Sequence, residues 1–230
     1  MVHPHITVNV ATSADGKIDS VLRRGATISS PTDKARVDAL RATVDAILVG
    51  GHTLLAEDPK LTVRSAVLRA ERLARGEPAN PAKVGIVSEA TLRLDGEFMT
   101  AGPARRLIYT TPLTTSEQLA LLQAAGAETF IVGESRVDLS AALDSLSQLG
   151  FRRLLVEGGG TLLFELFRLK AVDELFFYLA PKIFGGASAP TLADGPGFLP
   201  EQTPRLRLIS VQELDEAGGV LLHYTMEPQE

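Results

Sequence analysis

Two glycine-rich turns hold the residues best suited to binding a phosphorylated ligand. One turn, Gly50–Gly51, follows the short apolar run Asp45–Val49, and the other, Gly158–Gly160, lies between Glu157 and Thr161. Glycine lets a backbone approach a ligand closely, and the free N–H groups at a helix N-terminus attract anions. Both turns therefore predict a site for the phosphates of a nucleotide, although an ordinary crossover from strand to helix has the same pattern.

Neither turn has the spacing of the dinucleotide-binding fingerprint. No Gly-x-Gly-x-x-Gly follows the first predicted strand, which disfavours a standard Rossmann domain. Glu157 stands where a buried strand ends and a glycine run leads into a helix. Such a carboxylate could move a proton during catalysis, or it could simply be stabilised by the positive end of the helix dipole.

Two arginines flank the first turn. Arg41 lies near the end of the helix predicted before it, and Arg64 lies on the segment that follows. One strand with its flanking segments could bring both guanidinium groups to one face. There they would bind a phosphate monoester through parallel N–H···O bonds, with Lys17 as a further candidate. The alternative is that either arginine pairs with Asp45, Asp58 or another acidic neighbour and only holds the loop.

Composition excludes several other kinds of chemistry. The chain has no cysteine, which removes disulfides, thiolate catalysis and the zinc deaminase signature. Its histidines show no metal-ligand spacing, so no metal site is predicted. A net charge of −5 argues against a general nucleic-acid surface. No run approaches the roughly 18 apolar residues that span a bilayer. We therefore expect a cytoplasmic protein without nucleic-acid or membrane partners.

Short apolar runs alternate with helical patterns, which predicts parallel β-strands with helices on both faces. The predicted strands are His5–Ala11, Asp45–Val49, Lys83–Ser88, Arg106–Thr110, Glu128–Gly133, a run ending at Glu157, and Val172–Leu179. The predicted helices are Pro31–Thr43, Ser65–Gly76, Thr115–Ala125, Leu139–Leu149, and one running from near Thr161 through Phe167. Of these, Ser65–Gly76 is expected to be a surface excursion without a site, and Arg36 on the first helix is expected to be solvated.

The last part of the chain has a different pattern. Pro204–Glu213 and Val220–Met226 alternate between apolar and polar residues and are joined by a short glycine-containing loop, which predicts an antiparallel hairpin. The predicted fold is therefore α/β: a three-layer α/β/α sandwich around a mixed, mostly parallel sheet with a C-terminal antiparallel hairpin. The whole chain, residues 1–230, is expected to form a single domain.

Four blocks of sequence, in this order, carry a resemblance to a known family. They are NVATSADGKI at residues 9–18, DAILVGGHTLLAEDPKLTVR at 45–64, LLVEGGGTL at 154–162 and VDELFFYLAPKIFGG at 172–186. Together they resemble the pyrimidine reductases of riboflavin biosynthesis, which have a dihydrofolate-reductase-like fold. The resemblance covers the chain from about Ile6 to Leu222, and four ordered blocks are far more specific than one glycine motif.

The resemblance implies hydride transfer from NADPH, with NADH as the alternative, to C1′ of a 5-phosphoribosylamino-pyrimidine. It implies cofactor contacts from Ala11, Thr53, Glu57, Ser88, Gly158, Gly159, Gly160 and Thr161. It implies substrate contacts from Asn9, Arg41, Leu61, Arg64 and Glu157. Because no histidine or cysteine is well placed to move the proton of ring opening, Glu157 or ordered water is the candidate for that step.

The run from Pro181 to Phe198 is similar to stand-alone family members that reduce the pyrimidine before it is deaminated. A diaminopyrimidinone substrate is therefore expected, with the deaminated aminouracil as the alternative. Outside the family, the alternatives are a pterin or other heterocycle reductase of the same fold, and an NADPH-binding module without turnover. Keeping both Arg41 and Arg64 speaks against a substrate without phosphate.

A homodimer is also expected. The resemblance implies it, and the strand Glu174–Leu179 with Phe184 offers apolar surface, although helices could cover that strand instead. Two departures from the family pattern are visible. Glu57 stands where family members usually have aspartate, and Arg24–Ala26 replaces a serine that usually follows an acidic residue.

Overall fold

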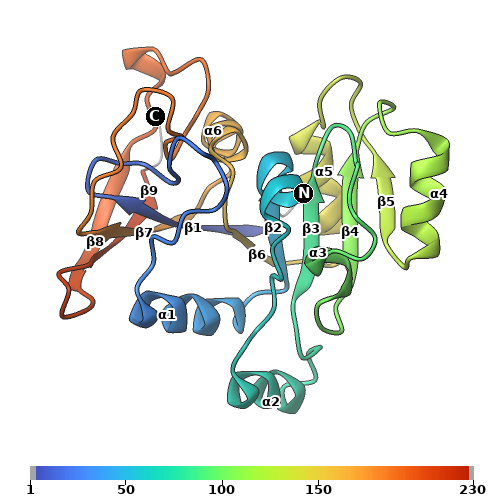
Figure 1. The fold of residues 1–230 in the computed structure, drawn as a ribbon, viewed down its shortest axis with the longest axis horizontal. Coiled ribbons are helices and arrows are strands. Elements are labelled where there is room, and N and C mark those ends of the chain that lie inside the picture. Colours follow the sequence, from blue (N-terminus) through green and yellow to red (C-terminus); the bar gives the residue numbers. More distant parts are fainter. Residues whose placement is uncertain (1–3, 228–230) are drawn as a thin grey trace. The chain divides into compact units, whose positions relative to one another are not determined.

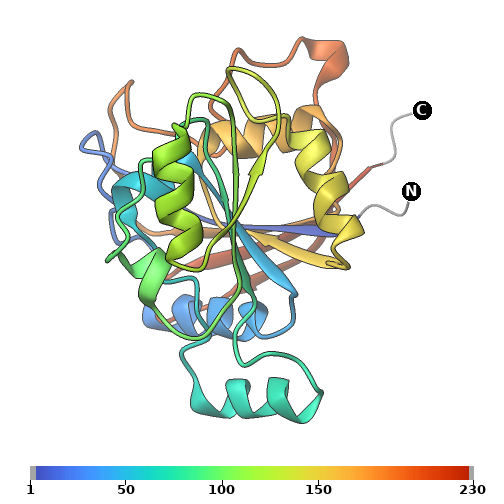
Figure 2. The same cartoon turned by 90° about the vertical axis from the view of Figure 1, so that its right-hand side faces the viewer.

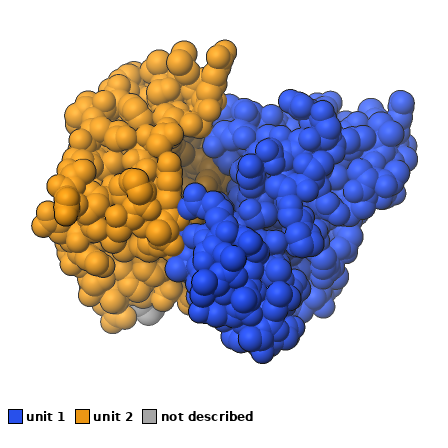
Figure 3. Space-filling model, turned by 60° about the horizontal axis from the view of Figure 1, so that its bottom comes forward, with its two compact units in different colours: residues 1–4, 38–155 blue, residues 5–37, 156–230 orange. Residues whose placement is uncertain are grey.

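The computed structural model describes residues 4–227 of the chain (Figure 1). These residues form two compact units, coloured separately in Figure 3. Of the described residues, the first unit comprises Pro4 and residues 38–155, and the second comprises residues 5–37 and 156–227. Within residues 4–227, none of the helices has the length and apolar character needed to span a bilayer.

The first unit is built on parallel strands. Its strands are β2 (Ala46–Gly50), β3 (Ala82–Ile86), β4 (Arg106–Thr110), β5 (Glu128–Ile131) and most of β6 (Arg153–Val156), in the order β5-β4-β3-β2-β6. Its helices are α2 (Ala66–Ala74), α3 (Glu97–Thr100), α4 (Ser116–Ala124) and α5 (Leu139–Gln148). The pairs β2–β3, β3–β4 and β4–β5 are all parallel.

Both faces of this sheet are covered by helices, as Figure 2 shows for α4 and α5. Ile108 of β4 belongs to the same buried cluster as Leu122 of α4. Its neighbour Tyr109 points to the other face, where its hydroxyl donates to Ser145 of α5 at 2.9 Å. Because each strand buries both faces, the first unit's strands read as continuous apolar runs rather than as alternating patterns.

The second unit combines parallel and antiparallel pairing. Its strands are β1 (His5–Ser13), β7 (Glu174–Ala180), β9 (Val220–Met226) and β8 (Leu206–Glu213), in the order β1-β7-β9-β8. β1 and β7 are parallel, whereas β9 is antiparallel to both β7 and β8. Helix α6 (Gly160–Arg168) and most of helix α1 (Pro31–Arg41) lie on opposite sides of β1 and β7 (Figure 1).

These elements confirm the predicted fold class. The described residues form nine strands of a mixed, mostly parallel sheet, and the last two strands make the predicted hairpin. Several boundaries differ. The first strand extends two residues beyond Ala11 because its pairing with β7 continues to Ser13, and the first helix ends at Arg41 instead of Thr43.

Two short elements were not predicted. They are α3, with four residues, and the 3₁₀ turn η2 (Pro200–Gln202), with three. The glycine turn Gly50–Gly51 leads into a single π-helical turn, η1 (Thr53–Glu57). Elements this short have little periodicity, and contacts from distant residues decide whether they form.

Candidate active site

The first glycine turn packs against the end of the neighbouring strand. A Cβ atom at Gly51 would lie 3.2 Å from the Val87 side chain, and one at Gly85 would lie 2.6 Å from the Leu54 side chain. Thr53 is buried, and the Ser88 carbonyl accepts hydrogen bonds from two threonine hydroxyls. The predicted cofactor residues Thr53 and Ser88 therefore both lie at the carboxyl ends of β2 and β3, where open α/β sheets bind ligands.

The segment after η1 has an unusual backbone. Asp58 and Leu61 are both in the left-handed region, with φ of 46° and 47°. The Asp58 carboxylate accepts hydrogen bonds from the backbone N–H groups of Glu97 (2.7 Å) and Phe98 (2.8 Å), which caps α3. Leu61 is 1% exposed and belongs to the core cluster of the first unit. The exposed Glu57 thus precedes a segment fixed by α3 and by the core.

Arg41, the last residue of α1, and Arg64, on the segment after η1, are each held by contacts within the first unit. Arg41 Nη1 donates to the Thr62 carbonyl at 2.9 Å. The buried carboxylate of Asp38 accepts the backbone N–H groups of Arg64 at 2.6 Å and Ser65 at 2.8 Å. The Arg64 guanidinium lies only loosely against Asp38, at 3.7 Å, and the side chain is 55% exposed. Asp38 therefore fixes the backbone of Arg64 while much of its side chain remains accessible.

Asp45 and Asp58, the two acidic residues considered as structural partners of these arginines, are engaged elsewhere. Asp58 caps α3. The Asp45 carboxylate accepts hydrogen bonds from Arg153 Nη2 and from the backbone N–H groups of Arg152 and Arg153, all at 2.8 Å. Although partial burial acts in the opposite direction, the bonds from Arg153 and Arg152 hold the pKa of Asp45 below its usual value. The acidic neighbour of Arg64 is instead Asp38.

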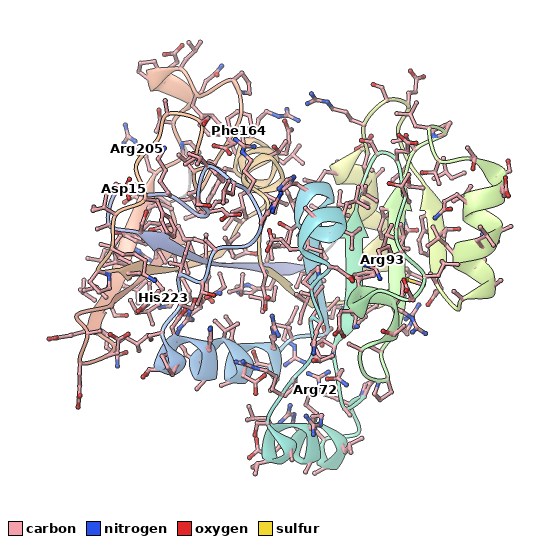
Figure 4. The ribbon with its side chains drawn as sticks, in the orientation of Figure 1. Asp15, Arg72, Arg93, Phe164, Arg205 and His223 are labelled. Atoms are coloured by element: carbon pink, nitrogen blue, oxygen red, sulfur yellow. The ribbon has the colours of Figure 1, made fainter. Side chains whose placement is uncertain are left out.

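Helix α2 positions the backbone next to Arg41, so the prediction that residues 65–76 form a surface excursion without a site is wrong. Arg72 on α2 is 2% exposed, and its Nη1 donates to the carbonyls of Ala42 (3.0 Å) and Val44 (2.8 Å), just after the end of α1 (Figure 4). Its Nε donates to the Pro78 carbonyl at 2.8 Å. Arg72 thus ties α2 to the backbone next to Arg41. No local pattern of the sequence distinguishes it from the other arginines of this helix.

In the second unit, Asn9 and Ala11 lie on one face of β1. Asn9 pairs in register with Phe176 of β7, and Ala11 with Tyr178. Arg36 of α1 reaches this face and donates from Nη2 to Asn9 Oδ1 at 2.6 Å. Arg36 also forms an ion pair with Asp33 at 2.7 Å and is only 17% exposed. The prediction that Arg36 is merely solvated is therefore wrong, because α1 packs its arginine over β1 and β7.

The second glycine turn has the geometry expected of a close-approach site. Gly158 and Gly159 have φ of 146° and 95°, and α6 begins at Gly160. A Cβ atom at Gly160 would lie 2.6 Å from the Thr191 carbonyl and 3.0 Å from a carboxylate oxygen of Asp194. Thr161 is exposed in the first turn of α6, and Glu157 is half-buried directly before the glycines.

Lys17 and Asp15 fasten the loop after β1 to the connection that follows β7. Lys17 Nζ donates to the Ala189 carbonyl at 3.2 Å. Asp15 (labelled in Figure 4) accepts from the Ser13 hydroxyl and from the backbone N–H groups of Phe184 and Gly185. The bond from Ser13, together with these backbone bonds, lowers the pKa of Asp15 to about 2. Lys17 thus has a structural partner within its own unit.

Comparison with known proteins identifies the family. The model of the RibD C-terminal domain matches residues 4–218. The chain belongs to this family. It is 39% identical over 223 residues to the 2,5-diamino-6-ribosylamino-4(3H)-pyrimidinone 5′-phosphate reductase of Archaeoglobus fulgidus, covering 97% of this chain and 99% of that protein. It is 34% identical to the enzyme of the same name from Aquifex aeolicus, over 86% of both chains.

Solved structures agree on the fold of this RibD C-terminal domain. A pyrimidine reductase-like protein from Corynebacterium diphtheriae superposes with a TM-score of 0.84 at 22% identity, covering 98% of this chain and 93% of that one. A riboflavin biosynthesis reductase from Saccharomyces cerevisiae superposes with a TM-score of 0.69 at 19% identity, covering 99% and 91%. The family resemblance and the fold expected from it are confirmed.

The RibD C-terminal domain places its predicted site residues in two sets. The first unit contains Arg41, Thr53, Glu57, Leu61, Arg64 and Ser88, and the second contains Asn9, Ala11, Glu157, Gly158, Gly159, Gly160 and Thr161. Sequence reasoning missed Asp33, Arg36, Asp38 and Arg72, which hold members of these sets in place. Only the buried contacts of these four residues reveal that role.

Proposed function

We propose that the protein reduces the ribosyl side chain of 2,5-diamino-6-ribosylamino-4(3H)-pyrimidinone 5′-phosphate to the ribityl form, with NADPH as the reductant. The observation that carries this proposal is the near-complete coverage of reductases of that name at 34–39% identity. The chain is a reductase by family. The attack at C1′ and the preference for NADPH over NADH are parts of the proposal.

The two glycine turns fit a dinucleotide. When bound, NADPH would supply the hydride for the reduction. Gly158 and Gly159 have backbone conformations that side chains rarely adopt, and the N–H groups that open α6 suit a pyrophosphate. In the first unit, Thr53 and Ser88 lie at strand ends of the kind that bind ligands in open α/β sheets. The carboxylate of Asp194 lies beside Gly160, and its negative charge disfavours a phosphate on that side of the turn.

The substrate phosphate is assigned in this proposal to Arg41 and Arg64. A phosphate monoester carries between one and two negative charges near neutral pH, and two guanidinium groups can engage it with charge-assisted hydrogen bonds. Asp38 holds the backbone of Arg64, and Arg72 holds the backbone just after Arg41, so both backbones are already ordered before a ligand arrives. Such preorganisation reduces the entropy lost on binding.

Glu157 is proposed to move the proton that accompanies opening of the ribose ring. It is half-buried at the end of β6 and directly precedes the glycines assigned to the cofactor. A general acid or base must come within hydrogen-bond reach of the proton that it transfers. The Glu157→Gln variant should therefore lose most of its kcat while keeping its affinity for NADPH.

We also propose that the protein is a homodimer that acts in the cytoplasm. The sequence argument from Glu174–Leu179 loses support, because Leu175 and Tyr178 are buried and Phe176 stacks on His223 at 4.2 Å. Strand β8 supports the dimer better, since all eight of its residues are exposed. An exposed apolar edge strand offers unpaired backbone groups to a second copy. A solution mass of 24.5 kDa at micromolar concentration would contradict the dimer.

An assay with two substrates tests the proposed function. Oxidation of NADPH is followed by absorbance with the diaminopyrimidinone and the deaminated aminouracil side by side. The proposal predicts a higher kcat/KM for the diamino compound. A preference for the aminouracil would assign the reaction to the later step, and NADPH binding without turnover of either compound would indicate a binding module.

A further inference from the structure

Lys83 is a fully buried lysine of the first unit. It lies on β3, between β2 and β4, and its side chain has no exposed surface. Its Nζ donates to the carbonyls of Glu97 at 3.2 Å, Phe98 at 2.9 Å and Ala101 at 2.7 Å, and it lies 5.8 Å from the centroid of the Phe98 ring. An ammonium group has three donors, so these three carbonyls satisfy it completely.

Helix α3 is held between charges of opposite sign. At its N-terminus, the Asp58 carboxylate accepts two backbone N–H groups of the helix. At its other end, Lys83 and Arg106 donate to its carbonyls, Arg106 through Nη1 to Met99. Each charge matches the free backbone groups at its end of the helix. Because a helix of four residues is not stable by itself, these charged contacts decide that α3 forms.

The Asp58 carboxylate also fixes the backbone beside a proposed cofactor contact. Asp58 directly follows Glu57 and has a left-handed φ of 46°. Gly96 lets the carboxylate come close to α3, because a Cβ atom there would lie 2.6 Å and 2.9 Å from the two carboxylate oxygens. A residue other than glycine keeps such a backbone only where its surroundings hold it. The bonds to α3 therefore set the direction in which the chain leaves Glu57.

We infer that Lys83 is a positioning residue for the cofactor: through α3 it holds Asp58, and thereby Glu57, in the orientation that binds NADPH. This inference rests on the proposed function, and it adds a buried residue on which cofactor affinity depends. A neutral lysine amine has two donors and one lone pair, so one of the three carbonyls would lose its bond and face that lone pair. Loss of the Lys83 proton should therefore loosen α3 and weaken NADPH binding.

The surroundings of Lys83 bring the loss of this proton into a measurable range. The charged groups that face it are Arg106 on β4, Glu97 on α3 and Asp58 after η1. Burial above all, and then the like charge of Arg106, lower the pKa of Lys83 to about 8, although the two carboxylates act in the opposite direction.

This titration separates cofactor binding from unfolding. The folded-state pKa of Lys83 lies below its ordinary value of 10.5, so the unfolded chain binds the proton more tightly. Through this group the fold becomes more stable, not less, as pH rises from about 8 to 10.5. A loss of NADPH affinity over the same range would therefore not result from unfolding caused by Lys83.

Fluorescence titration with NADPH from about pH 7 to about pH 9.5 tests the inference. The wild type should lose affinity about three- to tenfold as pH rises through this range, since one hydrogen bond to α3 is lost. Lys83→Met keeps a long unbranched side chain without the titrating group, so it should bind NADPH more weakly at pH 7 and show no dependence on pH. Lys60→Met is the matched control, because it removes an exposed ammonium group that lies 3.4 Å from the Glu97 carboxylate. It should keep the affinity and the pH dependence of the wild type.

Gly96→Ala tests the same contact without changing Lys83. The φ of Gly96 is −72°, which suits alanine, but the added methyl group would push the Asp58 carboxylate away from α3. NADPH affinity at pH 7 should fall about as far as in Lys83→Met. This variant decides the question if Lys83→Met does not fold.

The outcomes separate this inference from the proposed function. If the wild type reduces the pyrimidine but binds NADPH equally well at both ends of the pH range, the inference about Lys83 is overturned and the proposed function stands. The inference is also overturned if Lys83→Met keeps the pH dependence, or if a folded Gly96→Ala variant binds NADPH as the wild type does. A wild type that binds no NADPH at any pH overturns both.

Discussion

The glycine turn of the first unit and that of the second follow buried strands in the same way, but their backbones differ. Gly158 and Gly159 have φ of 146° and 95°, so the second turn needs glycine for its backbone conformation alone. Gly51 has an ordinary φ, and an added Cβ would lie 3.2 Å from the Val87 side chain and 3.5 Å from the Ile86 carbonyl. A glycine in a sequence motif can thus reflect backbone conformation in one turn and close packing in another.

The two units also differ in how they hold their charged groups. In the first unit, Asp38 and Arg72 bond backbone groups beside Arg41 and Arg64, and the Arg64 guanidinium lies 3.7 Å from the Asp38 carboxylate. In the second unit, Arg36 bonds the side chain of Asn9 directly. We therefore expect first-unit variants to act through stability and phosphate affinity, and second-unit variants to act through ligand orientation.

The largest expected effect on stability comes from Arg72. The Arg72→Met variant leaves the carbonyls of Ala42, Val44 and Pro78 without this buried donor, which should lower the free energy of unfolding by about 3 kcal/mol or more. Denaturant titration measures this loss. Arg75→Met is the matched control, because Arg75 bonds the same Ala42 carbonyl from a half-exposed position. Equal losses in the two variants would contradict the special role of burial at Arg72.

A pair of glycine variants separates the two turns. Gly159→Ala should destabilise the fold by about 1–3 kcal/mol, because alanine must adopt the φ of 95°. Gly51→Ala should destabilise the fold less, because its φ is ordinary, but lower NADPH affinity about tenfold, since the added methyl group would press on Val87 directly before Ser88, which is assigned to the cofactor. Melting curves and fluorescence titration with NADPH give the two readouts. A Gly51→Ala variant with unchanged NADPH affinity would remove the first turn from the cofactor site.

Thr161 offers a test of the second turn that leaves its glycines intact. Thr161→Glu places a negative charge in the first turn of α6, where it should favour the helix but repel a phosphate group. NADPH affinity should fall about tenfold while the melting temperature is maintained or rises. Thr161→Gln serves as the neutral control of similar size. If both variants bind NADPH as the wild type does, the phosphates lie away from α6.

The smallest expected effect concerns Asp15 and pH. Its folded-state pKa of about 2 lies below the usual aspartate value of 3.8, so its contribution to stability is present above pH 3.8 and is lost as pH falls toward 2. Melting temperatures of the wild type and Asp15→Asn should therefore converge between about pH 4 and pH 2. A constant difference across this range would mean that protonation of Asp15 is not linked to folding.

The sequence predicted best where local pattern decides the structure. Apolar runs bounded by glycine or charge correctly predicted the strands of the first unit, and β4 was predicted to the residue. Helix α3 could not be predicted, because its N-terminus is capped by Asp58, which lies 39 residues earlier than Glu97. Tertiary contacts of this kind leave no local periodicity.

The site residues show the same division. The family blocks contain Arg64 and the glycine turns, and the resemblance also implied Arg41, just before the second block. The structure gives each turn the strand before it and the helical turn after it. Sequence reasoning treated Arg36 and the Arg72 helix as solvated because most helical arginines are exposed. Burial of these two side chains depends on carbonyl, amide and carboxylate partners, most of them far away along the chain.

The central claim is that Arg64 binds the phosphate of a pyrimidine substrate. It is tested most directly by measuring KM for the phosphorylated substrate and for its dephosphorylated form, with the wild type and with Arg64→Ala. A charge-assisted contact contributes about 1.5–3 kcal/mol, so the variant should raise KM for the phosphorylated substrate about ten- to a hundred-fold. KM for the dephosphorylated form, NADPH affinity and the melting temperature should hardly change.

Arg93→Ala is the control, because it removes an exposed positive charge from the same unit, and it should leave both KM values unchanged (Figure 4). The account predicts that only Arg64→Ala loses the ability to distinguish the phosphorylated substrate from the dephosphorylated one. If Arg64→Ala instead binds the phosphorylated substrate normally and melts several degrees lower, Arg64 is a structural residue and the phosphate binds elsewhere.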